Sequence, residues 1–145
     1  MSGAAAHEIA NLLGLREPQG EPLSAFALIR QIDDGLSVAA LQAVADKVAP
    51  DDRSFVFRLM PRATLERRKR SQRLTPDEGG KVARLARVWA AAIDVWQDDV
   101  AARGFLSRPH SLLEGRKPID VVLGNEIGAT LVEDILGRLK YGTAA

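Results

Sequence analysis

The sequence predicts an all-α protein, and three observations indicate this fold class. Signals for β-strands are nearly absent, because the chain has one tyrosine, few runs of β-branched residues and no alternating stretch beside hairpin turn residues. Apolar residues instead recur at spacings of three and four, the period of an amphipathic helix. They make up 46% of the 145 residues, which is enough for a hydrophobic core. The length fits one domain, or two small domains that share a core.

The composition excludes several classes of protein. The chain contains no cysteine, which excludes a disulfide-stabilised scaffold and a zinc site with cysteine ligands. No apolar run approaches the ~18 residues of a membrane span. The first residues also lack the basic start and the long apolar stretch of a signal peptide. We therefore expect a cytoplasmic protein that makes no contact with a membrane.

The first half of the chain predicts a loose arm followed by four helices. Residues 1–22 form the arm, in which at most a brief helix is expected because glycine and proline recur there. Ser37 is placed to cap the second helix, and Asp51 or Asp52 the third. Pro61 fits the first turn of the fourth. The four helices are expected over 23–33, 38–48, 53–59 and 61–71.

The second half begins with a well-marked helix start. Thr75-Pro76-Asp77-Glu78 combines a capping box, a proline at the first helical position and acidic residues at the positive end of the helix dipole. The helix that follows is the longest, and its apolar stripe places Trp89 and Trp96 in the core. The last helix is expected to pack through an apolar face that begins at Leu131. The helices of this half are expected over 76–96, 98–106, 118–123 and 125–140.

Charge is unevenly distributed along the chain. The formal net charge is +1, yet residues 58–89 carry +7, between a segment of −4 and one of −2. Residues 38–71 follow the order helix, short helix, sharp turn and helix, which is the outline of a DNA-binding helix-turn-helix. A basic block on that outline indicates a nucleic-acid-binding surface. The alternative is a solvated basic helix of a protein-interaction domain.

The basic side chains follow the sharp turn at Met60-Pro61. Arg62 and Thr64 lie near the N-terminus of the helix, the end that reaches base edges in this motif. The later basic residues are better placed for phosphates, which set affinity more than sequence choice. Leu65 is expected to be the buried residue of this helix. The expected phosphate contacts are Arg67, Arg68, Lys69, Arg70 and Arg73.

Catalysis has little support in the sequence. The two histidines, His7 and His110, have no cysteine or acidic neighbour at metal-ligand spacing. No phosphate-binding loop, dinucleotide-binding glycine motif or nucleophile elbow is present. The aspartate pairs at 33–34, 51–52 and 98–99 sit at expected helix ends, where capping explains them better than acid–base chemistry. We therefore expect neither an enzyme nor a bound metal or cofactor.

Two stretches of the chain resemble the Xre/MbcA/ParS-type antitoxins, the partners of RES-domain toxins in bacterial toxin–antitoxin pairs. The first joins Thr-Leu-Glu-Arg-Arg-Lys-Arg at 64–70 to the capped helix start at 73–78. The second is Leu-Glu-Gly-Arg-Lys-Pro-Ile-Asp at 113–120, together with a C-terminal helix that ends in Tyr141-Gly142. The chain departs from the family pattern at Pro61, Gly79-Gly80 and Phe105.

The resemblance implies a protein in two parts. Residues 23–74 would form an Xre-like helix-turn-helix domain that binds the promoter of its own operon, and residues 75–145 a toxin-binding domain. RES toxins of this kind degrade NAD⁺, and the antitoxin blocks their active site through its C-terminal region. Such antitoxins typically form a homodimer, and two dimers can embrace a toxin dimer in a larger hetero-oligomer.

The resemblance also implies a toxin-binding tip at the end of the last helix. A cationic, aromatic, glycine-terminated tip can enter a pocket built for an anionic dinucleotide. Alternatively, the terminal glycine only caps the helix, and the cations complement the helix dipole. The tip consists of Arg138, Leu139, Lys140, Tyr141 and Gly142.

The sequence also fits two other functions. One is a stand-alone helix-turn-helix transcriptional regulator whose C-terminal helices only dimerise. The other is a helical protein-binding module with a degenerate helix-turn-helix. A toxin gene beside this one would favour the antitoxin, and salt-sensitive promoter binding would separate the two remaining functions.

Overall fold

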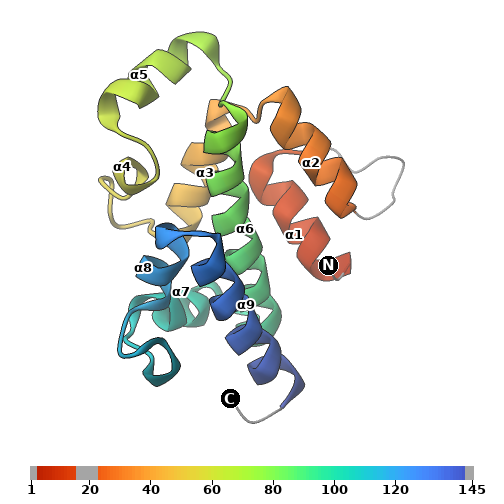
Figure 1. Ribbon diagram of the computed structural model, residues 1–145, viewed down its shortest axis with the longest axis vertical. Coiled ribbons are helices and arrows are strands. Elements are labelled where there is room, and N and C mark those ends of the chain that lie inside the picture. The colour runs from red at the N-terminus through yellow and green to blue at the C-terminus, as the bar shows by residue number, and fades with distance from the viewer. Residues whose placement is uncertain (1–2, 16–22, 143–145) are drawn as a thin grey trace. The chain divides into compact units, whose positions relative to one another are not determined.

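The computed structural model describes residues 3–15 and 23–142, and these residues form the all-α fold that the sequence predicts (Figure 1). Within these ranges there are nine α-helices, one short 3-10 helix and two isolated β-bridges, but no strand. None of the described helices is long and apolar enough to cross a membrane.

The chain divides into two compact units, Met1–Ala86 and Arg87–Ala145. The boundary lies inside the longest helix, α6 (Pro76–Trp96), whose first half belongs to the N-terminal unit and whose second half belongs to the C-terminal unit. The sequence analysis instead divides the chain at residue 74, before the capping box. A capping signal marks where a helix begins, but it carries no information about where along the helix the packing changes.

The first helix, α1 (Gly3–Leu13), packs against α3 (Val38–Val48) in the N-terminal unit. Ile9 and Leu13 are 1% and 2% exposed. This finding corrects the expectation of a loose arm, because the apolar spacing is unbroken until Gly14, whose φ of 68° ends the helix. Residues 1–2 and 16–22 of that arm lie outside the described residues.

Serine side chains begin the next two helices. Ser24 Oγ accepts a hydrogen bond of 3.0 Å from the backbone N–H of Ala27, at the start of α2 (Ala25–Asp34). Ser37 Oγ accepts one of 3.3 Å at the start of α3, as the sequence predicts. The segments that flank residues 38–71 are also joined, because the N–H of Leu74 donates to the carbonyl of Leu36 at 2.8 Å.

The short helix α4 (Val56–Leu59) begins later than the sequence predicts. Asp52 Oδ1 accepts hydrogen bonds from the backbone N–H and the hydroxyl of Ser54, at 3.0 and 2.6 Å. These bonds lower the pKa of Asp52. They form a turn that precedes the helix, because an aspartate can bond to the backbone two residues ahead as well as cap a helix. Phe55, which stands at the N-cap position, has no capping side chain.

The C-terminal unit contains the second half of α6 and three further helices, α7 (Asp99–Ser107), α8 (Pro118–Gly124) and α9 (Glu126–Tyr141). α7 packs against α8, and α8 against α9. The predicted cap of α7 is present, since Asp98 Oδ2 accepts from the N–H of Ala101 at 2.8 Å. The core includes the fully or almost fully buried Val88, Trp89, Ala92, Ala102, Leu106, Val122, Ala129, Val132 and Leu136.

Three large apolar side chains of this unit differ in how deeply they are buried. Trp89 is fully buried, as the sequence predicts, but Trp96 is 40% exposed and Leu131 is 50% exposed, so placing both of these inside was wrong. Trp96 is the last residue of α6, and its ring lies 6.3 Å from that of Phe105, centroid to centroid. Helical spacing alone does not distinguish a residue that continues a buried stripe from one that extends past the elements covering it.

Candidate functional site

The predicted helix-turn-helix is formed by α4 and α5 (Arg62–Ser71), which are joined at Met60 and Pro61. Leu65 is the buried residue of α5, as predicted, at 4% exposure. Leu59 and Met60 are buried as well. One side of α5 therefore faces the core of its unit, and most of its other side chains are exposed.

The first basic residue of α5 is held against the preceding helix. The guanidinium carbon of Arg62 lies 4.0 Å from the centroid of the Phe57 ring, within the range of a cation–π interaction. Thr64, in the first turn of the helix, is half-buried. Stacking on Phe57 gives Arg62 a defined position at the N-terminus of α5.

The middle of α5 carries the exposed cations. Arg67 and Arg70 are exposed and make no hydrogen bond or ion pair within the described part of the chain. Lys69 Nζ lies 3.3 Å from Glu66 Oε1, and both side chains are more than half exposed. An exposed pair of this kind contributes little to stability and is easily exchanged for another ion. These three cations are therefore available to an anionic ligand.

Arg68 is engaged differently from its neighbours. Its Nε and Nη2 donate to the two carboxylate oxygens of Glu78 at 2.6 and 3.0 Å, a bidentate pair between α5 and the start of α6. The hydrogen bond from Arg68 lowers the pKa of Glu78, and the same bond raises that of Arg68. We name this pair the Arg68–Glu78 clamp.

The same carboxylate completes the predicted capping box. The N–H of Thr75 donates to Glu78 Oε1 at 2.9 Å, and the N–H of Glu78 donates to Thr75 Oγ1 at 3.2 Å. Arg73, another predicted phosphate contact, donates from Nη1 to the carbonyl of Gly35 at 2.9 Å. The capping box is visible in the sequence but the clamp is not, because Arg68 lies ten residues before Glu78, outside any local helical spacing.

The other candidate site is the tip of α9. Gly142 has a φ of 69° and its N–H donates to the carbonyl of Arg138, so it caps the helix. Lys140 Nζ donates to the carbonyl of Asp94 at 3.1 Å and lies 3.6 Å from the carboxylate of the same residue. Tyr141 is 78% exposed and Leu139 38%. Residues 143–145 lie outside the described chain.

The two cations of the tip therefore differ in position. Lys140 binds the last turn of α6 through Asp94, and Arg138 is exposed on the surface. Tyr141, which follows Lys140, extends into solvent. The structure brings the five predicted residues together at the end of one capped helix, and it assigns a local structural role to two of them, Lys140 and Gly142.

Arg87 anchors the other half of α9 to α6. Its Nη2 donates to Glu126 Oε1 at 2.6 Å and to Glu133 Oε1 at 2.8 Å. Burial opposes the charge of this guanidinium, but the two carboxylates outweigh it and raise the pKa of Arg87. Sequence analysis did not find this contact, which joins residues 39 and 46 positions apart.

The histidines take part in local structure. His110 Nδ1 accepts a hydrogen bond from the N–H of Leu112 at 3.1 Å, and its ring packs against Phe105. His7 lies beside Asn11 on α1. Over residues 3–15 and 23–142 no group of three or more metal-ligating side chains is present.

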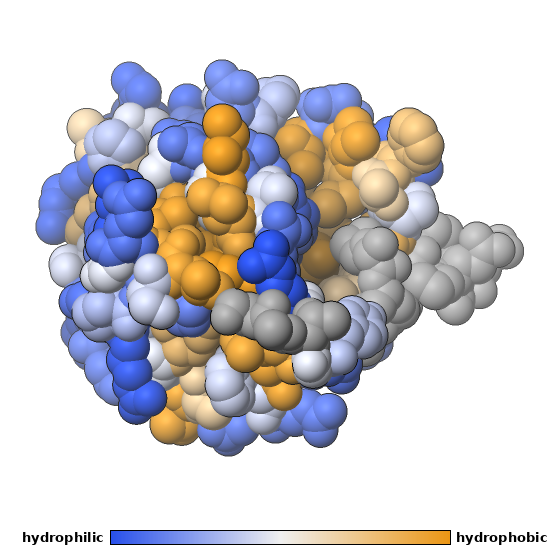
Figure 2. Space-filling model, turned by 60° about the horizontal axis from the view of Figure 1, so that its bottom comes forward, coloured by the Kyte–Doolittle hydropathy of each residue, from blue (hydrophilic) through white to orange (hydrophobic). Residues whose placement is uncertain are grey.

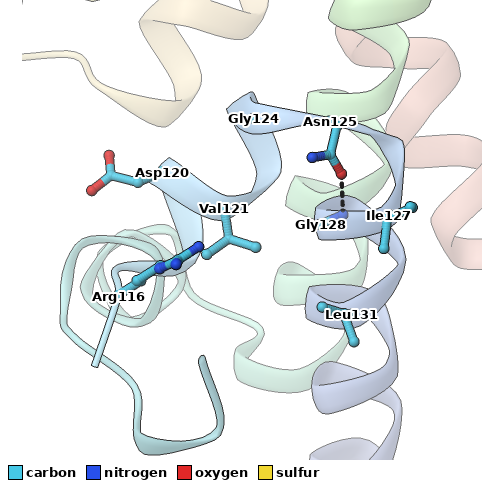
Figure 3. A pocket seen from close by; sticks show the side chains of 8 residues that line it. All are labelled: Arg116, Asp120, Val121, Gly124, Asn125, Ile127, Gly128 and Leu131. Atoms are coloured by element: carbon cyan, nitrogen blue, oxygen red, sulfur yellow. Dashed lines mark hydrogen bonds between the residues drawn. The ribbon is translucent and has the colours of Figure 1, made fainter. Parts of the chain in front are cut away.

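One surface feature was missed by the sequence analysis. A pocket of about 420 Å³ lies between α8 and α9 in the C-terminal unit (Figure 3). Val121, Ile127 and Leu131 line it, and Arg116 and Asp120 contribute polar groups. Its apolar lining could not be read from the sequence, because Leu131 follows the spacing of a core residue.

Comparisons with known proteins match both units. Residues 27–87 match the antitoxin Xre-like helix-turn-helix domain, and residues 91–142 match the antitoxin Xre/MbcA/ParS C-terminal toxin-binding domain. The chain is 39% identical over 82 residues to the antitoxin Xre of Yersinia enterocolitica, covering 56% of this chain and 55% of that protein. It is 30% identical over 125 residues to the antitoxin Xre of Pseudomonas putida, covering 84% of this chain and 76% of the relative.

The two matched domains follow one another in the same order as the two units of the structure. The first match ends at residue 87 and the second begins at residue 91, close to the boundary between the units. The P. putida relative is similar along most of both chains. The chain therefore belongs to the Xre/MbcA/ParS family of antitoxins, with an Xre-like helix-turn-helix domain followed by a C-terminal toxin-binding domain.

Proposed function

We propose that this antitoxin neutralises a RES-domain toxin that degrades NAD⁺, and that the tip of α9 blocks the toxin's active site. The observation that carries the proposal is the exposed Arg138 and Tyr141 at the end of a capped, anchored helix. Arg87 holds the first half of that helix and Lys140 its last turn. A fixed tip loses little conformational freedom on docking, which favours tight binding.

The chemistry of the tip suits a pocket that accepts a dinucleotide. A guanidinium offers a planar fork of donors to carboxylates or to polar groups that would otherwise hold a phosphate, and a tyrosine ring can stack where a base or nicotinamide ring would lie. Arg138 and Tyr141 are assigned these two roles. Lys140 is assigned a positioning role, because its ammonium already binds the end of α6.

The test is co-expression with the cognate toxin gene, sought beside this one, following growth and cellular NAD⁺. The Arg138→Ala, Tyr141→Ala double variant is expected to fold and to lose protection, since tyrosine and arginine anchors commonly contribute more than ~2 kcal/mol at an interface. A chain that ends at Gly137 is expected to lose protection more completely. The matched control is Lys81→Ala, Val100→Ala, which changes one exposed cation and one exposed apolar residue outside both α9 and the loop over residues 107–118.

Full protection by the chain that ends at Gly137 would overturn the assignment of the blocking surface. It would leave the loop over residues 107–118 as the next candidate. If co-expression shows no toxicity from the neighbouring gene and the chain binds its promoter, the stand-alone regulator is the better description.

The second part of the proposal is that a homodimer of the chain binds the promoter of its operon through α5. The exposed Arg67, Lys69 and Arg70 carry this part, since three cations within four residues of one helix suit phosphates. Arg62 and Thr64 are assigned to base edges, because they occupy the first turn of the helix that reads DNA in this motif.

Promoter binding is tested by measuring affinity at several salt concentrations. Arg67→Ala, Arg70→Ala is expected to lower affinity for all sequences and to reduce the log-affinity against log-salt slope by about 0.9 per lost contact. Arg30→Ala on α2 is the control, because it removes an exposed cation from the same unit outside α5. Unchanged binding by the double variant would remove α5 as the DNA-contacting helix.

A further inference from the structure

The outer face of α9 carries a row of exposed side chains from its first turn to its last. Ile127 is 75% exposed, Leu131 50% and Tyr141 78%, and Arg138 is exposed as well. Steps of four, seven and three residues return to the same side of a helix, so these four side chains share one face. We name this row the α9 stripe.

The apolar end of the α9 stripe coincides with the pocket between α8 and α9. Ile127 and Leu131 line the pocket from α9, and Val121 lines it from α8, with Arg116 and Asp120 at its polar side (Figure 3). Figure 2 brings the bottom of the Figure 1 view forward and shows that apolar side chains also gather in a patch on that face, with hydrophilic ones around it. A contiguous exposed apolar patch with a polar surround is typical of a protein interaction site.

The shape of the pocket is fixed by the backbone. A Cβ at Gly128 would overlap the carbonyl oxygen of Val121, so α8 and α9 approach more closely there than any other residue permits. Asn125 Oδ1 accepts from the N–H of Gly128 at 2.9 Å and fixes the turn between the helices. The pocket therefore lies between two helices in tight contact and is formed before any partner binds.

We infer that the toxin docks along the whole α9 stripe and inserts an apolar side chain into the α8–α9 pocket, while the tip blocks its active site. This inference rests on the proposed function of the tip and extends the same interface. The pocket would anchor the complex, and the tip would inhibit. The expected anchor is a branched or aromatic side chain flanked by polar groups that pair with Arg116 and Asp120.

The α9 stripe runs without interruption from the pocket to the tip, which favours the toxin over a second copy of this chain as the partner that fills the pocket. The stripe leads from Ile127 to Arg138 and Tyr141 on a single helix face, and the matched toxin-binding domain, residues 91–142, contains all of it. A second copy that covered Ile127 and Leu131 would lie along the face that the tip needs for the toxin. A homodimer built on this stripe would therefore compete with neutralisation.

The experiment compares affinity with inhibition, using the full chain and the purified cognate toxin. Ile127→Asp and Leu131→Asp each place a charge at an exposed apolar position, so the fold is expected to survive, as circular dichroism and thermal melting would show. The toxin's dissociation constant is expected to rise about 30-fold, the loss typical of an interface anchor. Saturating amounts of either variant should still inhibit NAD⁺ hydrolysis fully. Val100→Asp on α7, at a position 72% exposed, is the matched control and should bind as the wild type does.

The chain that ends at Gly137 separates the two roles. It should still bind the toxin through the pocket but leave NAD⁺ hydrolysis largely intact. If the Asp variants bind with wild-type affinity while the shortened chain fails to inhibit, the pocket inference is overturned and the proposed function of the tip stands. If neither change affects binding or inhibition, both are overturned. If the Asp variants convert a dimer into monomers and bind toxin normally, the pocket belongs to a second copy and the inference is wrong.

Discussion

At the scale of single residues, Arg68 and Glu78 determine how α5 is held. The carboxylate of Glu78 accepts from the guanidinium of Arg68 and from the N–H of Thr75, so one side chain both caps α6 and fixes the helix before it. Arg67 and Arg70 have no such contacts. Neighbouring arginines on one helix therefore have different roles, which composition and charge counts do not distinguish.

The first prediction separates positioning from DNA contact. Arg68→Ala and Glu78→Gln are expected to lower promoter affinity by similar factors, because each opens the Arg68–Glu78 clamp and frees α5. Neither should change the salt slope, since no phosphate contact is lost, whereas Arg67→Ala should reduce the slope by about 0.9. The sequence-based assignment of Arg68 to a phosphate would be correct if Arg68→Ala reduced the slope and Glu78→Gln left affinity unchanged.

The second prediction concerns pH. The folded-state pKa of Glu78 lies below its ordinary value of 4.5, so the stability that the clamp contributes is fully present above pH 4.5. It is lost as the pH falls through the lowered pKa and the carboxylate is protonated. Melting temperatures from pH 7 to pH 3 should therefore fall less steeply for Glu78→Gln than for the wild type. Glu66→Gln, which changes an exposed carboxylate, should follow the wild-type curve.

At the scale of elements, α9 is fixed at three points along its length. Asn125 caps its start, Arg87 bonds to Glu126 and Glu133, and Lys140 binds the end of α6. The sequence predicts the existence and approximate bounds of this helix, because its apolar period is strong. It does not predict the contacts made by Arg87 and Lys140. Their partners lie 39 to 46 residues away along the chain, whereas caps and amphipathic faces depend on residues within a few positions of one another.

The third prediction uses two glycines of α9. Gly128→Ala is expected to destabilise the protein by roughly 1–3 kcal/mol or more, because the added methyl group would overlap the carbonyl of Val121. Gly137→Ala is expected to stabilise it by roughly 0.5–1 kcal/mol, since nothing lies within 4 Å of the added group and alanine favours a helix. Denaturant titration of both variants measures the two effects. Equal stabilisation by both variants would show that helix propensity, rather than the contact with α8, governs the effect at Gly128.

At the scale of the whole molecule, the fold class follows from periodicity, but the limits of the core do not. Trp89 and Trp96 occupy equivalent positions seven residues apart, yet the first is fully buried and the second is 40% exposed. The C-terminal end of α6 extends beyond the helices that cover the rest of its apolar stripe. The buried face of α5 and the capping box were predictable, because both depend on residues close in sequence. The point at which the apolar stripe of α6 becomes exposed was not, because it depends on how far the neighbouring helices extend.

The fourth prediction tests this difference by calorimetry. Trp89→Ala is expected to cost roughly 3–5 kcal/mol, because it removes a fully buried side chain. This is a large part of a total stability of ~5–15 kcal/mol, so much of the protein should unfold near physiological temperature. Trp96→Ala should lower the melting temperature far less. Similar losses from both variants would place Trp96 in the core after all.

The division of the chain inside α6 has a practical consequence for separating its two activities. A cut between residues 86 and 87 would end one fragment and start the next in mid-helix, with Leu85 and Ala86 on one piece and Val88 and Trp89 on the other. Each piece would carry half of a buried stripe without the turns that continue it. Fragments that each retain residues 75–96 would overlap by one helix and keep its capping box and its buried stripe intact. Dissection of this antitoxin therefore calls for duplicating a helix rather than dividing one.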